Sequence, residues 1–166
     1  ILKCRPSTKY LVLEMGIEYP GEMDFYLWLA EPDVAVITNI YPTHTLYLDN
    51  LDGVAREKGK IVSKLTLSDT LVMAENNKYK DKISKMTKAK IITFGEGGNV
   101  RAEKITFTEE LNTKYTLVTR LGKIDIQMPI LGYQFVQDSL AAVATAISLS
   151  IDLIKIKKGI ERYETP

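Results

Sequence analysis

Two kinds of hydrophobic pattern alternate along the first 94 residues of the chain. Short continuous apolar runs, most of them rich in β-branched residues, occupy residues 10–15, 34–40, 70–74 and 90–94. Runs of this length are typical of strands that are buried on both faces. The stretches with apolar residues at helical spacing lie between these runs, at residues 22–30, 51–65 and 77–87. This strand–helix alternation predicts a parallel sheet with helices on its faces and right-handed crossovers.

The pattern changes after the glycine-rich residues 95–98. This segment lacks the G-x-x-x-x-G-K-[ST] order of a phosphate-binding loop, so we interpret it as a turn. Three short β segments follow at residues 100–107, 115–120 and 123–128, and two helices at residues 136–149 and 153–163. The β segments predict an antiparallel meander or hairpin added to the sheet. The predicted fold class is therefore α/β: a mostly parallel sheet flanked by helices, with a small antiparallel β extension.

Composition narrows the class of protein only slightly. The 166 residues carry 22 basic and 21 acidic side chains, and this balance gives no electrostatic reason to expect nucleic acid or an anionic membrane as a partner. No apolar run reaches the roughly 18 residues that cross a bilayer, so we expect no membrane insertion. Cys4 is the single cysteine, which excludes a disulfide or a cysteine metal cluster within the chain. A reducing cytoplasm is the simplest compartment for such a chain.

Four polar residues are expected at one edge of the predicted sheet. Glu14 ends the first apolar run, Asn39 ends the second, and His44 lies in the loop that follows. Lys58 lies on the next predicted helix. Ligands of open α/β sheets bind beyond the carboxyl ends of the strands, where these groups would meet. Each residue alone also has an ordinary interpretation, as a capping acid, a loop histidine or a lysine on a solvated helix face.

Taken together, these residues resemble the ATPase domain of the Mur ligases. That family carries a Glu-x-Gly at the end of one strand, here Glu14-Met15-Gly16, and a Thr-Asn at the end of the next, here Thr38-Asn39. A histidine and a lysine follow, and here Lys58 comes fourteen positions after His44. The segment Pro20-Gly21-Glu22 is most similar to the branch that adds D-alanyl-D-alanine to UDP-N-acetylmuramoyl-tripeptide.

The resemblance implies a P-loop-NTPase-like domain that binds ATP and Mg²⁺. It implies that Glu14, His44 and Lys58 serve the metal, with Lys58 carbamylated by carbon dioxide into an anionic oxygen ligand. His44 and Lys58 would be the catalytic residues, and Asn39 would position a metal-bound water or the substrate carboxylate. Water-mediated contact of His44 stays open, because nitrogen is a poor ligand for magnesium. The implied reaction transfers the γ-phosphoryl group of ATP to a carboxylate, and an amine then displaces phosphate from the acyl phosphate. The implied partners are a UDP-linked muramoyl peptide and a dipeptide amine.

A second stretch also resembles the family, at residues 129–132 and 140–142. Relatives commonly have His and Asn where this chain has Gln134 and Asp138. The asparagine lies at the nucleotide base in the family, so Asp138 is a candidate nucleotide contact that lacks the amide donor. The alternative for Asp138 is an acid near a helix N-terminus, which the helix dipole stabilises.

The family also carries elements that this sequence does not include. A P-loop precedes the Glu-x-Gly strand, and a C-terminal domain follows the alanine-rich helix. We therefore expect residues 1–166 to form a single domain, the central ATPase domain without its P-loop segment, and to be inactive in isolation. Two alternatives stay open: a non-catalytic Mur-like module for protein association, and a related ligase that joins another acid and amine. A glycine-rich loop ending in Lys-Ser or Lys-Thr in the upstream coding sequence would favour the ligase.

Overall fold

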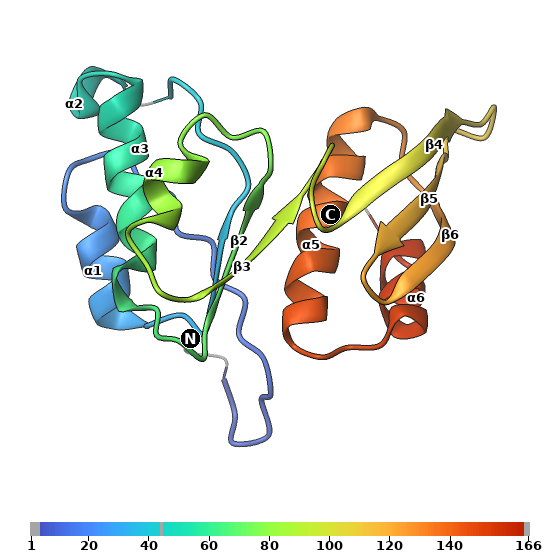
Figure 1. The fold of residues 1–166 in the computed structure, drawn as a ribbon, viewed down its shortest axis with the longest axis horizontal. Coiled ribbons are helices and arrows are strands. Elements are labelled where there is room, and N and C mark those ends of the chain that lie inside the picture. The colour runs from blue at the N-terminus through green and yellow to red at the C-terminus, as the bar shows by residue number, and fades with distance from the viewer. Residues whose placement is uncertain (1–3, 44, 165–166) are drawn as a thin grey trace.

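The computed structural model describes residues 4–43 and 45–164 and consists of helices packed on two small sheets (Figure 1). The helices are α1 (Glu22–Leu29), α2 (Thr45–Leu48), α3 (Leu51–Gly59), α4 (Lys80–Ser84), α5 (Tyr133–Ser148), α6 (Leu153–Glu161) and the 3₁₀ helix η1 (Lys60–Lys64). The strands are β1 (Val34–Ile37), β2 (Thr70–Ala74), β3 (Lys90–Phe94), β4 (Arg101–Phe107), β5 (Thr113–Thr119) and β6 (Gly122–Met128).

The first sheet is parallel, with the strand order β1-β2-β3. Every residue of the central strand β2 is buried, which explains its continuous apolar sequence. Side chains of β2 alternate between two cores. Leu71 and Met73 pack in one core with residues of α3, η1 and α4, whereas Val72 and Ala74 pack in another core with α5. Figure 1 accordingly shows α3 and α4 on one side of this sheet and α5 on the other.

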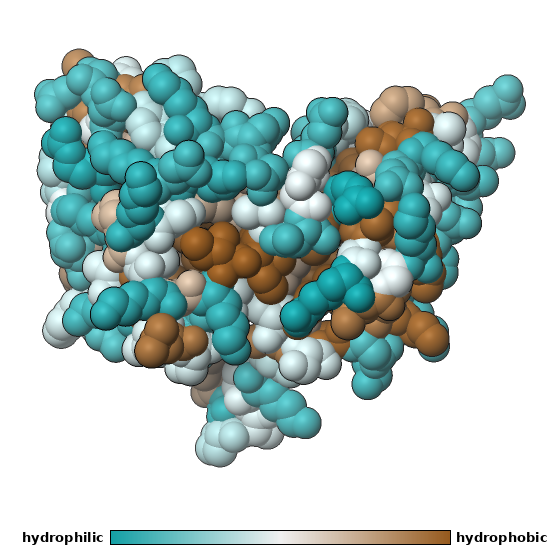
Figure 2. Space-filling model, in the orientation of Figure 1, coloured by the Kyte–Doolittle hydropathy of each residue, from teal (hydrophilic) through white to brown (hydrophobic). Residues whose placement is uncertain are grey.

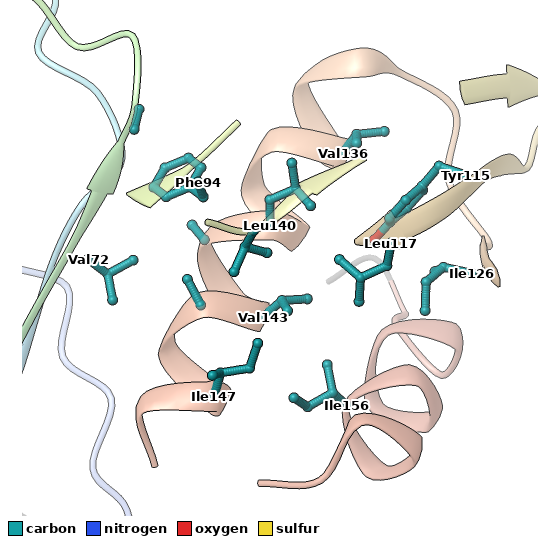
Figure 3. Close-up of a cluster of buried hydrophobic side chains, with 14 of the residues drawn as sticks. Val72, Phe94, Tyr115, Leu117, Ile126, Val136, Leu140, Val143, Ile147 and Ile156 are labelled. Carbon is teal, nitrogen blue, oxygen red and sulfur yellow. The ribbon is translucent and has the colours of Figure 1, made fainter. Parts of the chain in front are cut away.

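The second sheet is antiparallel, with the order β4-β5-β6, and it packs against α5 and α6. Figure 3 shows that α5 lies between the two sheets: Val72 and Phe94 approach it from one side, Leu117 and Ile126 from the other. The hydroxyl groups of Tyr115 on β5 and Ser139 on α5 are hydrogen bonded at 2.7 Å inside this core. One helix therefore supplies the apolar surface that both sheets need.

The predicted architecture is confirmed, because a parallel sheet flanked by helices is joined to an antiparallel one. The turn predicted at residues 95–98 is also present, with Gly95 at φ 96° and Gly97 at φ 76°. Only glycine adopts such angles without strain. The predicted helix at residues 77–87 is restricted to α4, because Asn77 forms a turn in which its side chain accepts a hydrogen bond from the amide of Tyr79.

The strand predicted at residues 10–15 is wrong. This segment belongs to neither sheet, and the side chain of Val12 is 91% exposed. A strand requires a neighbour that exchanges backbone hydrogen bonds with it. Among the described residues β1 pairs with β2 alone, and no ladder reaches residues 10–15. The apolar run was therefore not sufficient evidence for a paired strand.

Apolar side chains are also exposed on the face that Figure 2 shows, around the middle of the molecule. Ile91 of the edge strand β3 is 39% exposed. A small surface pocket of about 190 Å³ lies beside it, between β3, Arg120 and the C-terminal part of α5. Within the described residues, no helix is both long enough and apolar enough to span a membrane.

Candidate functional site

The carboxyl ends of the three parallel strands lie at one edge of the first sheet. Thr38 and Asn39 follow β1, Glu75 follows β2 and Gly95 follows β3. The N-terminal part of α5 reaches the same edge, because a Cβ atom added to Gly95 would lie 3.1 Å from Oε1 of Gln137. This edge therefore gathers polar groups from four separate parts of the chain. The sequence pattern predicted this position for Asn39, but it did not predict the groups after β2 and β3.

Lys58 on α3 is the residue whose surroundings are most unusual at this edge. Its Nζ donates a hydrogen bond of 3.1 Å to the backbone oxygen of Asn39. Partial burial lowers the pKa of the Lys58 ammonium group. No carboxylate of the described residues pairs with it. The amine of Lys58 consequently loses its proton more easily than an exposed lysine would.

Lys60 is the opposite case, although it lies only two positions further along. Its Nζ lies 2.6 Å from Asp24 and 2.9 Å from Glu57, and these two acids raise the pKa of Lys60. These acids therefore stabilise the cationic form of Lys60, whereas partial burial disfavours the cationic form of Lys58. Sequence reasoning could not separate these two lysines, because Asp24 comes from a distant part of the chain.

Glu57 is a buried carboxylate to which the sequence pattern assigned no role. Its side chain is 5% exposed, and its Oε1 accepts hydrogen bonds from the amides of Gly21, at 2.9 Å, and Met23, at 3.1 Å. One signal was present in the sequence. Glu57 follows Val54 by three positions and precedes Ile61 by four, so it lies on the apolar face of the predicted helix. An acid on such a face must find buried partners.

The other two predicted metal ligands are Glu14, which has no described contact with Lys58, and His44. Glu14 is exposed, and its neighbour Met15 packs against the same small core as Ile40, directly after Asn39. The segments that carry Glu14 and Asn39 therefore meet at one cluster, but no described contact joins Glu14 to Lys58. His44 lies outside the described residues. Within the described ranges, no group of three or more His, Cys, Asp or Glu residues could hold a metal ion.

Asp138 lies on α5, and within the described residues it forms no hydrogen bond or ion pair with Lys58 or Asn39. The helix begins at Tyr133 and not at residue 136 as predicted, so Asp138 lies beyond the first turn. The interpretation of Asp138 as an acid stabilised by the helix N-terminus is therefore wrong, because that effect fades after the first turn. Its neighbour Gln137 is the residue that approaches the end of β3.

A polar network joins the ends of β2 and β3, and the sequence analysis assigned no role to it. Glu75 forms an ion pair with Lys80, and hydrogen bonds from Lys80 and Thr93 lower the pKa of Glu75. Oδ1 of Asn99 accepts hydrogen bonds from the amide of Thr93 at 2.9 Å and from its hydroxyl at 3.1 Å. These bonds fix the glycine turn at the edge of the sheet, close to the start of α5.

Comparison with known proteins identifies this arrangement. The sequence model of the Mur ligase middle domain matches residues 1–146. The chain belongs to the Mur ligase family. The resemblance inferred from Glu14, Asn39, His44 and Lys58 is thereby confirmed at the level of the family.

Two relatives show which Mur ligases this domain is similar to. The chain is 32% identical over 163 residues to the UDP-N-acetylmuramoyl-tripeptide–D-alanyl-D-alanine ligase of Buchnera aphidicola, covering 96% of this chain and 35% of that protein. A crystal structure of MurF from Acinetobacter baumannii superimposes with a TM-score of 0.93 at 30% identity, covering 99% of this chain and 36% of that one. The branch expected from the Pro20-Gly21-Glu22 segment is therefore the one to which these relatives belong.

The Mur ligase fold extends to more distant structures. MurF from Thermotoga maritima, solved in complex with ADP, has a TM-score of 0.77 at 17% identity, a likeness of fold alone. The chain spans about a third of the length of the curated relatives that it matches. The match to the solved structures also supports the predicted combination of a parallel sheet with an antiparallel extension.

Proposed function

We propose that this chain is the central domain of an ATP-dependent ligase of peptidoglycan precursor synthesis. The proposed ligase adds D-alanyl-D-alanine to UDP-N-acetylmuramoyl-tripeptide, as the names of the relatives describe for those proteins. Residues 1–166 would form one domain of it, and other parts of the protein would supply the P-loop and the amine site. A cytoplasmic location belongs to the proposal, since the exposed free thiol of Cys4 agrees with a reducing compartment.

The observation that carries the proposal is the position of Lys58, whose Nζ reaches the backbone oxygen of Asn39 after β1. The ammonium group first loses a proton; the neutral amine then attacks carbon dioxide, forms a nitrogen–carbon bond and releases a second proton, which leaves an anionic carbamate. Burial lowers the pKa of Lys58 and therefore raises the fraction of neutral amine. No carboxylate of the described residues holds it as an ammonium group, in contrast to Lys60. An ammonium group at this place would repel a divalent cation.

The donor set at this edge fits magnesium. Mg²⁺ needs only one or two carboxylates from a protein and takes its other ligands from phosphate groups and water. Exposed Glu14 and a carbamylated Lys58 would supply such oxygen atoms, and His44 would act directly or through water. When bound, the metal and ATP supply charge neutralisation and the γ-phosphoryl group, which passes to the substrate carboxylate to give an acyl phosphate.

The other residues would orient the reacting groups. Asn39 presents its backbone oxygen to Lys58, which leaves its exposed side chain available to a water molecule or the substrate carboxylate. Asp138 would face the nucleotide base from α5, where its carboxylate could accept a hydrogen bond from the exocyclic amine of adenine. The incoming amine would then displace phosphate from the acyl phosphate and form the amide.

The test uses the full-length protein that contains this chain. Phosphate release is measured with ATP, UDP-N-acetylmuramoyl-tripeptide and D-alanyl-D-alanine, and ¹³C-bicarbonate is used to detect a carbamate carbon by NMR. We expect Lys58→Ala to lose both the activity and the carbamate signal, and a small carboxylate such as formate to restore part of the activity. The matched control is Lys60→Ala, which removes a neighbouring lysine and should retain the carbamate signal. A wild-type protein without the signal would refute the role of Lys58.

The alternative of a non-catalytic interaction module is favoured by one observation. The exposed side chains of Phe25, Trp28 and Leu29 form an apolar surface on α1, with the rings of Phe25 and Trp28 5.9 Å apart. Such surfaces often mark contacts with other protein segments. Absence of phosphate release with several acid and amine substrates would favour this alternative, whereas release with a different pair would indicate a related ligase.

A further inference from the structure

We propose that Glu57 is a positioning residue that holds Lys58 in place by attaching the last turn of α3 to the segment that begins α1. The inference rests on the proposed function, because it assigns to Glu57 a role in placing a residue of that site. Glu57 itself would touch neither substrate nor metal.

The contacts of Glu57 divide between its two oxygen atoms. Oε1 accepts both backbone hydrogen bonds, from Gly21 at 2.9 Å and from Met23 at 3.1 Å. Oε2 lies 2.9 Å from Nζ of Lys60, which also pairs with Asp24 on α1 at 2.6 Å. A buried charge of this kind is tolerated only when its partners are fixed, so the position of the helix turn and that of the segment depend on each other.

Lys58 is the next residue on the same turn. Successive side chains of a helix point about 100° apart, so Glu57 and Lys58 reach two different neighbouring segments. Glu57 holds the start of α1, while Lys58 reaches the backbone oxygen of Asn39 after β1. The α-helix changes to the 3₁₀ helix η1 directly after Gly59. Hydrogen-bond geometry is poorer in a 3₁₀ helix, so side-chain contacts determine the position of this turn more than usual.

The attached segment also leads back to Glu14. Oε2 of Glu22 accepts a hydrogen bond from the amide of Tyr19 at 2.8 Å, and Ile17 is buried in the small core beside α3. The chain between Glu14 and α1 is therefore fixed at several points, and Glu57 joins its end to the helix of Lys58. Glu57 consequently sets the distance between two proposed metal-binding segments that are far apart in the sequence.

Three substitutions in the full-length protein separate positioning from simple support of the fold. Glu57→Ala removes all contacts of Glu57. Glu57→Gln keeps Oε1 and its two backbone bonds but loses the charge that pairs with Lys60. Asp24→Asn is the matched control, since it removes the other partner of Lys60 and leaves the bonds of Glu57 to the backbone intact.

The first measurement is the acylation of Lys58 by acetic anhydride without nucleotide, followed by peptide mass spectrometry. We expect Glu57→Ala to increase labelling of Lys58 by about tenfold, because a lost charged hydrogen bond shifts a local equilibrium by about that factor. Glu57→Gln and Asp24→Asn should stay close to wild type. This readout does not depend on ligase activity, so it tests the positioning even if the proposed reaction is wrong.

The second measurement is steady-state kinetics. We expect Glu57→Ala to lower kcat and to raise the magnesium concentration for half-maximal activity, while the KM values of the acid and amine substrates stay unchanged. A kcat and a magnesium dependence close to wild type in Glu57→Gln would show that the loss in Glu57→Ala comes from the two backbone hydrogen bonds. Should Glu57→Ala fail to fold, Glu57→Asp, which withdraws the carboxylate by one methylene group, is measured in the same way. Unchanged labelling and kcat together with a lower melting temperature would overturn the proposal, because Glu57 would then only support the fold.

Discussion

The buried hydrogen bond between Tyr115 and Ser139 predicts that removal of one hydroxyl group destabilises the chain more than removal of the other. Tyr115 is 2% exposed and Ser139 is 9% exposed, and their hydroxyl groups lie 2.7 Å apart. The hydroxyl of Ser139 also lies 2.7 Å from the backbone oxygen of Val136, to which it donates. Tyr115 is therefore the donor in the shared bond, and Ser139 is the acceptor.

Removal of the two hydroxyl groups, one at a time, should lower the free energy of unfolding by different amounts. Tyr115→Phe removes the donor and leaves Ser139 bonded to Val136, so it should destabilise the chain by about 1 kcal/mol. Ser139→Ala leaves the tyrosine hydroxyl buried without an acceptor, which should cost about 2–3 kcal/mol. The double variant contains no unpaired hydroxyl, so its cost should be smaller than the sum by about 1 kcal/mol.

Urea unfolding followed by far-UV circular dichroism measures these differences if the transition is two-state. A Tyr115→Phe variant that is less stable than Ser139→Ala, or costs that simply add in the double variant, would refute the assigned direction of the bond.

The same tyrosine predicts a loss of stability at high pH. Burial raises the pKa of Tyr115 to about 12 in the folded chain, above the ordinary value of about 10 that applies to the unfolded chain. Between these values the folded state binds more protons, so the free energy of unfolding falls as the pH rises. The stabilisation is complete below pH 10, and about 2–3 kcal/mol is lost by pH 12. Tyr115→Phe should remove this contribution, and identical pH dependence of both proteins would contradict the reasoning.

Two further outcomes follow from the packing and the electrostatics. Leu140 is 1% exposed and lies in the core between α5 and the sheets. Leu140→Ala should therefore lower the free energy of unfolding in urea by about 2–5 kcal/mol. Leu121→Ala, at an exposed position, should lower it far less. Lys58→Met should abolish the proposed ligase activity of the full-length protein without lowering its melting temperature, because it replaces a partly buried amine by an apolar group of similar length. A melting temperature several degrees lower would show that the bond to Asn39 stabilises the fold.

The sequence predicted best those elements whose environment is uniform. β2 has the predicted bounds, since every residue of this central strand is buried. The bounds of the edge strand β3 were also predicted correctly, although its first two residues are exposed. The start of α5 was predicted late, because Tyr133 and Gln134 are exposed and do not extend the apolar pattern. The apolar pattern of residues 10–15 carries no information on whether a neighbouring strand is present to exchange backbone hydrogen bonds with it.

In the candidate site too, the features that follow from local sequence pattern were predictable, whereas those that depend on contacts between distant residues were not. The convergence of Asn39 and Lys58 was predictable, because parallel strands and the helices between them have a fixed geometry. The opposite pKa shifts of Lys58 and Lys60 were not predictable, since that of Lys58 comes from its burial and that of Lys60 from Asp24 and Glu57. Glu57 could have been noticed as an acid on an apolar face, but its partners lie 34 and 36 positions away. The role of His44 stays a prediction.

The position of α5 limits how this protein can be divided. Val72 and Phe94 cover one side of the helix, and Leu117 and Ile126 cover the other (Figure 3). A shortened chain that ended after β3 would lose the helix that covers one face of the parallel sheet. A chain that began at β4 would leave the opposite side of α5 in water. Neither half retains a complete core, so the smallest portion of these residues that buries its own apolar surface extends from the first sheet through α6.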